Sequence, residues 1–253
     1  MKIVKLAVLA AFLPITAQAA SVDLSGWISE EANGERGSNW NVQGAGNDSV
    51  FQTQNSRPSV FFDSGALDRG TSLEGEIRVE TTSDDDFIGF VLGYDTGEFD
   101  GSTSDFWLID WKQADQSFPG LGTSFAGMSL SHVTGNVGAA DELDFWQHTG
   151  VVNEVQRATT LGSTGWNDNQ SYNFKLTFTA NLIEVFVDDQ KELSFAGSFG
   201  DGAFGFYNYS QSQVRYAGIT EDQLPAPVPL PAAGFLLAGA LGGMGLMRRR
   251  KKA

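Results

Sequence analysis

Apolar and polar residues alternate along several stretches of this 253-residue chain, as expected for β-strands that bury one face. In residues 73–79 the odd positions hold Leu, Gly, Ile and Val, and the even positions hold Glu, Glu and Arg. Residues 172–178 show the same alternation, residues 183–187 follow a short turn, and residues 188–191 turn the chain into 192–195. The last three segments predict an antiparallel meander.

Between residues 20 and 224 there is no long stretch of helical apolar period, no proline-rich linker and no internal repeat. Ten or more short strands in about 200 residues predict one all-β domain, with two antiparallel sheets packed as a sandwich or jelly roll. Residues 30–57, rich in Gly, Asn and Ser, are expected to form loops over one end. Further short apolar runs, each bounded by Gly, Asp, Asn or Ser, lie at 60–62, 87–94, 106–111, 128–133, 203–209 and 214–219.

Both ends of the chain differ from this middle part. Residues 1–19 combine two lysines, an apolar run of about ten residues and a closing Ala-Gln-Ala, which is the pattern of a cleaved signal peptide. That run is too short to span a bilayer. At the other end, the 18 residues 230–247 would form a helix of about 27 Å, which fits one membrane span. The five cations at 248–252 would hold its end in the cytoplasm and leave the preceding domain outside.

The C-terminal segment, residues 225–253, contains Val-Pro-Leu-Pro-Ala at 228–232, then a Gly-rich span and an Arg/Lys tail. It resembles the bacterial PEP-CTERM sorting signals of the VPLPA type. The resemblance implies a Gram-negative exported protein, transiently anchored in the inner membrane, whose tail a membrane sorting peptidase recognises. An ordinary tail anchor that stays in place is the alternative.

Composition narrows the chemistry of the exported domain. There is no cysteine, which excludes disulfides, thiolate zinc sites and cysteine nucleophiles. The formal net charge is −15, and all 31 acidic residues but only 9 of the 16 basic ones lie between the two sorting segments, so the exported part carries −22. Such a surface repels phosphate, which argues against nucleic-acid binding and favours dependence on a divalent cation.

Six segments stand out by their sequence: DDDFIGFVLGY (84–94), FWLIDWKQ (106–113), GMSL (127–130), WQHTG (146–150), GWND (165–168) and GFYNYSQ (205–211). In order, spacing and residue type over about 140 residues, they resemble the C-terminal lectin-like domain of thrombospondins. The resemblance implies a concanavalin A-like jelly roll, calcium binding and an extracellular adhesive or matrix role. The aspartate-rich repeats and the cysteine typical of that family are absent, and Asp110 replaces an apolar residue in the strand linked to an animal receptor, so that receptor is not inferred.

Asp84, Asp85 and Asp86 are the main candidates for metal ligands. Three adjacent carboxylates repel one another, and a hard cation such as Ca²⁺, which takes six to eight oxygens, would relieve the repulsion. A solvated acidic turn is the alternative reading of the residues, and the thrombospondin resemblance adds weight to calcium. Candidates for the remaining oxygens are Asp95, Asp110 and Asp168. Asp110 interrupts an apolar strand, so a paired, structural role competes with metal binding there.

The sequence gives little support for catalysis. Glu142 and Asp144 resemble the start of the catalytic strand of jelly-roll glucanases, but Trp146 and Gln147 stand where a second glutamate is needed. His148 is expected to be packed and hydrogen-bonded, and neither a serine-hydrolase elbow nor a phosphate loop is present. We therefore expect a protein that is not an enzyme.

Tryptophans are the candidate ligand-binding residues. Trp107 and Trp166 could stack on sugar rings, although core packing is the usual role of a tryptophan in a strand. Trp166 lies in a turn-like stretch and is expected to be the more exposed. The resulting hypothesis is a non-catalytic, exported calcium-binding module for cell-surface adhesion or biofilm matrix organisation, with an extracellular glycan or a surface protein as partner. The alternative is a lectin that acts on exopolysaccharide.

Overall fold

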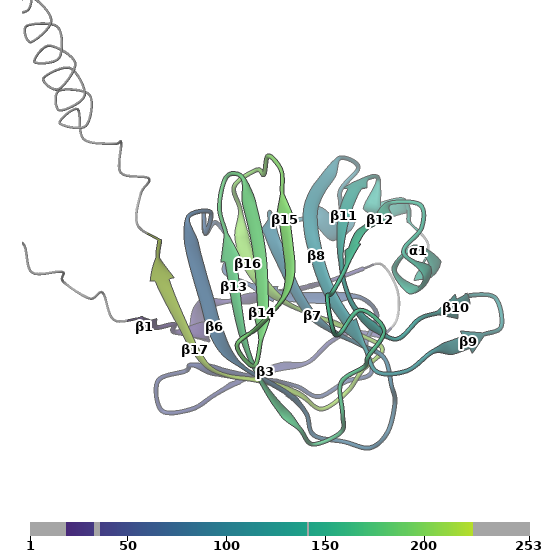
Figure 1. The fold of residues 1–253 in the computed structure, drawn as a ribbon, viewed down its shortest axis with the longest axis horizontal. Helices are drawn as coiled ribbons and strands as arrows, with labels where there is room; N and C mark the ends of the chain where they lie inside the picture. The colour runs from purple at the N-terminus through teal and green to yellow at the C-terminus, as the bar shows by residue number, and fades with distance from the viewer. Residues whose placement is uncertain (1–18, 33–35, 141, 225–253) are drawn as a thin grey trace, which may run out of the picture. The chain divides into compact units, whose positions relative to one another are not determined.

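Two β-sheets, here sheets A and B, form the domain in the computed structural model, which describes residues 19–32, 36–140 and 142–224. Figure 1 shows their arrangement. Sheet A contains β1 (Ala20–Ser21), β3 (Trp40–Gln43), β4 (Ser49–Gln52), β6 (Thr71–Val79), β13 (Ser171–Phe178), β14 (Leu182–Val187), β15 (Gln190–Ala196) and β17 (Val214–Gln223). Sheet B contains β2 (Ile28–Glu31), β5 (Ser59–Phe62), β7 (Phe87–Tyr94), β8 (Ser104–Lys112), β11 (Gly127–Gly135), β12 (Val152–Arg157) and β16 (Ala203–Tyr209).

The strand order follows the antiparallel pairing of neighbours such as β7 with β8 and β16. Sheet A runs β15-β14-β13-β6-β17-β4-β3, with β1 paired to β17, and sheet B runs β12-β11-β8-β7-β16-β5-β2. A separate hairpin joins β9 (Gln116–Phe118) to β10 (Gly122–Ser124). The helical segments are α1 (Glu142–Gln147) and the 3₁₀ turns η1 (Leu24–Gly26), η2 (Glu98–Asp100) and η3 (Val137–Ala139).

The main core lies between the two sheets. It joins residues of sheet A such as Leu73 and Leu176 to residues of sheet B such as Ile88, Phe90 and Ile109. Alternation in β6 and β13 follows from this arrangement, because each of these strands turns its other face to solvent.

A second core covers the outer face of sheet B. Phe87 and Val91 point there from β7, opposite to Ile88 and Phe90, and every residue of β7 is buried. The cover consists of η2, η3 and α1, which contribute Phe99, Val137, Phe145 and Trp146. Burial on both faces explains why residues 87–94 read as a continuous apolar run and not as an alternating strand.

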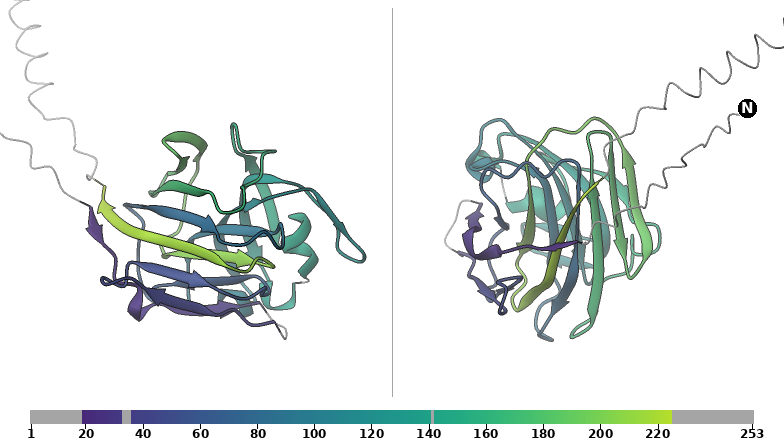
Figure 2. Two further views of the ribbon diagram at one scale, coloured as in Figure 1. Left: turned by 90° about the horizontal axis from the view of Figure 1, so that it is seen from below. Right: turned by 90° about the vertical axis from the view of Figure 1, so that its left-hand side faces the viewer.

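The two ends of the described domain lie side by side. Ala20 of β1 pairs with Glu221 near the end of β17. In Figures 1 and 2 the β9–β10 hairpin and α1 lie at the opposite end of the sandwich from this pair. The hairpin end is thus far from the point where the chain continues towards residue 225.

The structure confirms the predicted all-β, lectin-like jelly roll, and every segment predicted as a strand lies in a strand of sheet A or sheet B. The expectation of loops at 30–57 is wrong in part, since β3 and β4 lie there and pair with each other. The signal peptide apart from Ala19 and the 225–253 sorting segment lie outside the described residues, and residues 223–253 separate from 1–222 as a second unit. In the part of the chain that is described, no helix is long and apolar enough to cross a membrane.

The second core should contribute substantially to stability. Phe106 of β8 is fully buried there, with Tyr94 and Phe99 against its ring at 5.1 and 6.0 Å. We expect Phe106→Ala to lower the free energy of unfolding by about 3–5 kcal/mol in urea titrations, because it leaves a cavity. Leu67→Ala, at a residue that is 68% exposed, should change it by less than about 0.5 kcal/mol. Equal effects would contradict this account.

Candidate metal centre and the adjoining pocket

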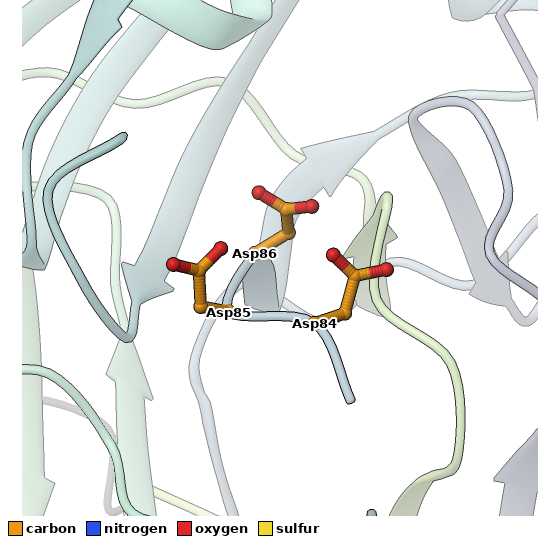
Figure 3. A group of neighbouring side chains, drawn as sticks. All are labelled: Asp84, Asp85 and Asp86. Carbon is orange, nitrogen blue, oxygen red and sulfur yellow. The ribbon is translucent and has the colours of Figure 1, made fainter. Parts of the chain in front are cut away.

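Three aspartates converge on the loop that leads into β7, here called the aspartate loop (residues 84–86). Figure 3 shows their carboxylates on the same side of the loop, and one oxygen of each lies within 4.8 Å of the others. Asp84 has the left-handed φ of 77°, which turns the chain at this point. Asn55 donates a hydrogen bond to Asp84, and the buried Gln211 accepts one from the backbone N–H of Asp86 at 3.1 Å.

A buried lysine stands behind the aspartate loop. Lys112, the last residue of β8, has a fully buried side chain whose Nζ lies 2.6 Å from Asp86 Oδ1. Nζ also donates to the Asp85 carbonyl at 3.1 Å and to Gln116 Oε1 at 3.2 Å. The rings of Trp146 and Phe87 lie 4.6 and 5.1 Å from it. The ammonium is therefore held by carboxylate, carbonyl and aromatic faces together.

The environment changes the acidity of Asp86. Burial raises its pKa to about 6, the ammonium of Lys112 opposes that rise, and a hydrogen bond and charge repulsion from Asp84 add to it. A cation beside both carboxylates would remove the repulsion between them.

The aspartate loop has the charge and a free ligand atom for a divalent cation. Three carboxylates offset by one ammonium leave two negative charges, which match the charge of Ca²⁺. Asp85 Oδ1 is buried and accepts no hydrogen bond from any described residue, and its nearest cation is Lys112 Nζ at 3.7 Å. Because Ca²⁺ prefers carboxylate oxygens, this orphaned atom fits a calcium ligand.

The other aspartates named from the sequence do not join this group. Asp95 follows the far end of β7, so roughly 30 Å of extended strand separates it from Asp86. Asp168 accepts a hydrogen bond from Gln113 at 3.0 Å. Asp110 is 1% exposed on β8 and is bound by His148 and Ser129. Asp110 is therefore paired, as the alternative interpretation of this residue held, and its partner is His148.

His148 joins α1 to sheet B through buried ion pairs, as its predicted packed and hydrogen-bonded role requires. Its Nε2 lies 2.8 Å from Asp110 Oδ2 and its Nδ1 lies 3.0 Å from Glu154 Oε2. Burial lowers the pKa of His148, but the two carboxylates outweigh burial and raise the pKa to about 9. The imidazolium thus holds the end of α1 against β8 and β12.

A pocket of about 370 Å³ opens beside the aspartate loop. Phe118 and Leu121 of the β9–β10 hairpin form one wall, and Trp146 of α1 lies beside Tyr209 of β16, their ring centroids 6.1 Å apart. The volume is within the range of small-ligand sites. Its polar lining includes Arg36, Asn55, Asp84, Asp86, Gln116 and Glu142.

Neither tryptophan named as a ligand-binding candidate lines this pocket. The expected exposure of Trp166 is wrong: it is 1% exposed, and its Nε1 donates to the carbonyls of Asp86 and Trp111 at 3.1 Å each. Gly165 permits this close packing, since a Cβ there would lie 1.7 Å from the Gln113 carbonyl oxygen. Trp107 is partly buried, and the ring of His132 covers one face at a centroid distance of 4.3 Å.

The segment that resembled a glucanase strand is the helix α1. Glu142 pairs with Arg36 and Arg57, while Asp144 accepts a hydrogen bond from Val151 N–H at 3.3 Å. The two carboxylates are thus engaged in holding the surrounding loops, and the strand geometry of a retaining glycosidase is absent from residues 142–147.

Sequence reasoning gave no role to Lys112 and Phe118. Lys112 lies on the same face of β8 as Phe106, Leu108 and Asp110. A lysine on the buried face of a strand could therefore have indicated a buried ion pair. Phe118 precedes Pro119-Gly120, a typical turn pair, which indicates a hairpin with an aromatic residue at its start.

The fold is a lectin-like β-sandwich, with a pocket beside the aspartate loop. The chain belongs to the thrombospondin C-terminal region family, whose sequence model matches residues 35–222. It is 29% identical over 202 residues to thrombospondin-2 of Homo sapiens, covering 72% of this chain and 16% of that protein. With thrombospondin-4 of Bos taurus it shares 31% over 208 residues, covering 76% and 21%. The chain thus spans about a fifth or less of the length of these relatives.

Two solved structures have a fold similar to that of this chain. The carbohydrate-binding module CBM66 of Bacillus subtilis superposes with a TM-score of 0.52 at 12% identity, covering 78% of this chain and 95% of that one. The VIP36 exoplasmic/lumenal domain in its Ca²⁺/Man3GlcNAc-bound form gives 0.54 at 13% identity, covering 85% and 92%. At these identities the similarity establishes the fold.

Removal of the buried Lys112 ammonium should lower the stability of the protein. In Lys112→Met the carboxylate of Asp86 loses its buried partner, so the free energy of unfolding at pH 7.5 should fall by about 3–5 kcal/mol. Lys175→Met removes an ammonium that is 46% exposed and paired with Glu74, and should cost less than about 1 kcal/mol. Urea denaturation of both variants measures the difference, and similar losses would contradict the role given to Lys112.

Loss of the proton from His148 should lower the stability of the protein at alkaline pH. Its pKa is about 9 in the folded protein against about 6.5 when unfolded, so the stabilisation is complete below pH 6.5 and is lost as pH rises through 9. The free energy of unfolding should drop by on the order of 3 kcal/mol across that window. His148→Gln should flatten this part of the curve, and an unchanged slope would refute the assignment.

Proposed function

We propose that the chain is a non-catalytic, exported module that binds calcium at the aspartate loop and acts in cell-surface adhesion or in organising an extracellular matrix or biofilm. The observation that carries this proposal is the convergence of the Asp84, Asp85 and Asp86 carboxylates, of which Asp85 Oδ1 is buried and accepts no hydrogen bond from any described residue. Calcium bound there would neutralise the two charges that Lys112 leaves uncompensated. It would also fix the loop that forms one side of the pocket.

The position of the pocket supports an adhesive role. The pocket lies at the hairpin end of the sandwich, while β1 and the end of β17 lie at the other end (Figures 1 and 2). The segment after residue 224, which its sequence predicts to hold the protein at a membrane, would join the domain at the end opposite to the pocket. A partner in the surroundings could then reach it.

The residues of the pocket also support a lack of catalysis. Glu142 is engaged with Arg36 and Asp86 with Lys112. Asp84 accepts a hydrogen bond from Asn55. An acid and a base for hydrolysis would need two carboxyl groups arranged on either side of a substrate bond. Here the carboxylates of Glu142, Asp86 and Asp84 bind neighbouring side chains and so hold the loops around the pocket in place, as a preformed binding site requires.

A lectin that acts on exopolysaccharide is the second candidate function. It is favoured by the combination of an exposed aromatic ring, Phe118, with amides and carboxylates in one pocket. Adhesion through a glycan would satisfy both candidates.

Calcium should stabilise the protein. If millimolar calcium reaches one hundred times Kd, the free energy of unfolding rises by about 2.7 kcal/mol, which raises Tm by roughly 5–10 °C over the value in EDTA. Asp85→Asn should abolish most of this increase because it removes a ligand charge. Differential scanning calorimetry of the purified protein with calcium and with EDTA measures both effects.

Asp189→Asn is the matched control for this experiment. It makes the same change of charge in the exposed turn between β14 and β15, far along the chain from the aspartate loop. This variant should keep the full calcium shift. A shift that is absent in the wild type, or unaffected by Asp85→Asn, would remove the calcium proposal.

A further inference from the structure

The β9–β10 hairpin is a rigid support for one exposed aromatic ring. Leu121 N–H donates to the Phe118 carbonyl at 3.1 Å, and Gly120 has φ 88°, which together close a tight turn around Pro119. Ser117 Oγ and Thr123 Oγ1 are 2.7 Å apart across the strands. The orientation of Phe118 at the end of β9 is therefore set by its own hairpin.

The hairpin is also fixed against α1. Trp146 Nε1 donates to the Gly122 carbonyl at 3.2 Å, and a Cβ at Gly122 would lie 1.7 Å from Gln147 Nε2. The Gln147 amide is the end of a flexible side chain and could move aside, but the left-handed φ of 74° at this position favours glycine. Phe118 thus stands at a set position relative to Trp146 and the pocket between them.

Two phenylalanines of this hairpin region are exposed without a packing role in the domain. Phe118 is 55% exposed and Phe125, which follows β10, is 59% exposed. Only the first of the two lines the pocket. An aromatic ring at the wall of a polar pocket offers a flat apolar surface beside hydrogen-bonding groups, whereas Phe125 offers only the apolar surface.

The polar groups of the pocket suit hydroxyl groups. Asp84 and Glu142 are acceptors, and the amide of Gln116 is held through its oxygen by Lys112 Nζ at 3.2 Å. Its Nε2 makes no hydrogen bond to a described residue and remains available to an incoming oxygen. Neighbouring hydroxyls of a sugar donate to carboxylates and accept from amides in this manner.

The charge of the pocket limits the kind of sugar. Its lining holds the carboxylates of Asp84, Asp86 and Glu142, and the cations beside them are already paired, Lys112 with Asp86 and both Arg36 and Arg57 with Glu142. The surroundings are acidic too, since the chain carries a net charge of −15. A uronate or sulfate group would therefore find no unpaired side-chain cation among the described residues here, and calcium at the aspartate loop would only offset the two charges of its own ligands.

We propose that this pocket is a saccharide subsite for a glycan without acidic groups, in which the Phe118 ring packs on the C–H face of a sugar. In this arrangement Asp84 and Gln116 bind the hydroxyls of the same sugar. The inference rests on the proposed function in one respect: it takes the pocket beside the aspartate loop as the ligand site of the module.

The test compares Phe118→Ala with Phe125→Ala in the full chain. Binding to immobilised dextran, mannan, galactan and laminarin, which are uncharged, is measured in calcium by biolayer interferometry, with alginate and polygalacturonate as acidic polymers. We expect the wild type and Phe125→Ala to bind at least one polymer of the first set. Phe118→Ala should bind it about tenfold more weakly, because it loses the ring contact. Both substitutions are at exposed residues, so both variants should fold.

Three results would overturn the proposal: binding to the acidic polymers alone, equal weakening by both substitutions, or no binding to any polymer. Calorimetry of Phe118→Ala separates this failure from that of the proposed function. If its calcium-dependent rise in Tm persists while no glycan binds, the saccharide subsite is refuted and the calcium-binding module stands. If glycans bind but calcium does not shift Tm, the calcium proposal is refuted alone.

Discussion

The ion pair between Lys112 and Asp86 is the contact on which the rest of this end of the molecule depends. A buried ammonium is costly unless carboxylate and carbonyl oxygens surround it, and here Asp86, the Asp85 carbonyl and Gln116 do so. Through these bonds the end of β8 is joined to the aspartate loop and to the start of the hairpin. The same ammonium lies against Trp146, so α1 is joined as well. One charge therefore sets the relative positions of the elements that form the pocket.

That arrangement requires a core on both faces of sheet B. Because η2, η3 and α1 cover the outer face, Lys112, Asp110 and Tyr207 are buried although they do not face sheet A. His148 fixes the end of α1 through two carboxylates. Of the polar groups in this second core, Lys112 pairs with Asp86 and His148 with Asp110, whereas the Tyr207 hydroxyl has no hydrogen-bond partner among the described residues. The pocket opens where the cover ends, beside Trp146. Binding chemistry is thus concentrated where the second core meets solvent.

Much of the fold could be predicted from the sequence, because strand alternation and short apolar runs depend on local pattern. The aspartate loop could also be predicted, since its three carboxylates are adjacent in the chain. Other features depend on contacts between distant residues. Trp166 has turn-forming neighbours, yet Gly165 lets its loop approach Gln113 and buries the ring. Lys112 meets Asp86 only once β7 and β8 pair, and α1 forms from residues that resembled a strand.

The pairing of β1 with β17 has a mechanical consequence. A ligand held at the hairpin end and a chain that continues from Gln223 would load the sandwich along its strands. Hydrogen bonds of an antiparallel ladder lie perpendicular to the strands, so such a tension shears many of them at once instead of opening them one by one. The ten residues of β17, held between β6 and β4, would carry that tension. Tension applied between the hairpin end and the end of β17 would therefore act on this ladder as shear.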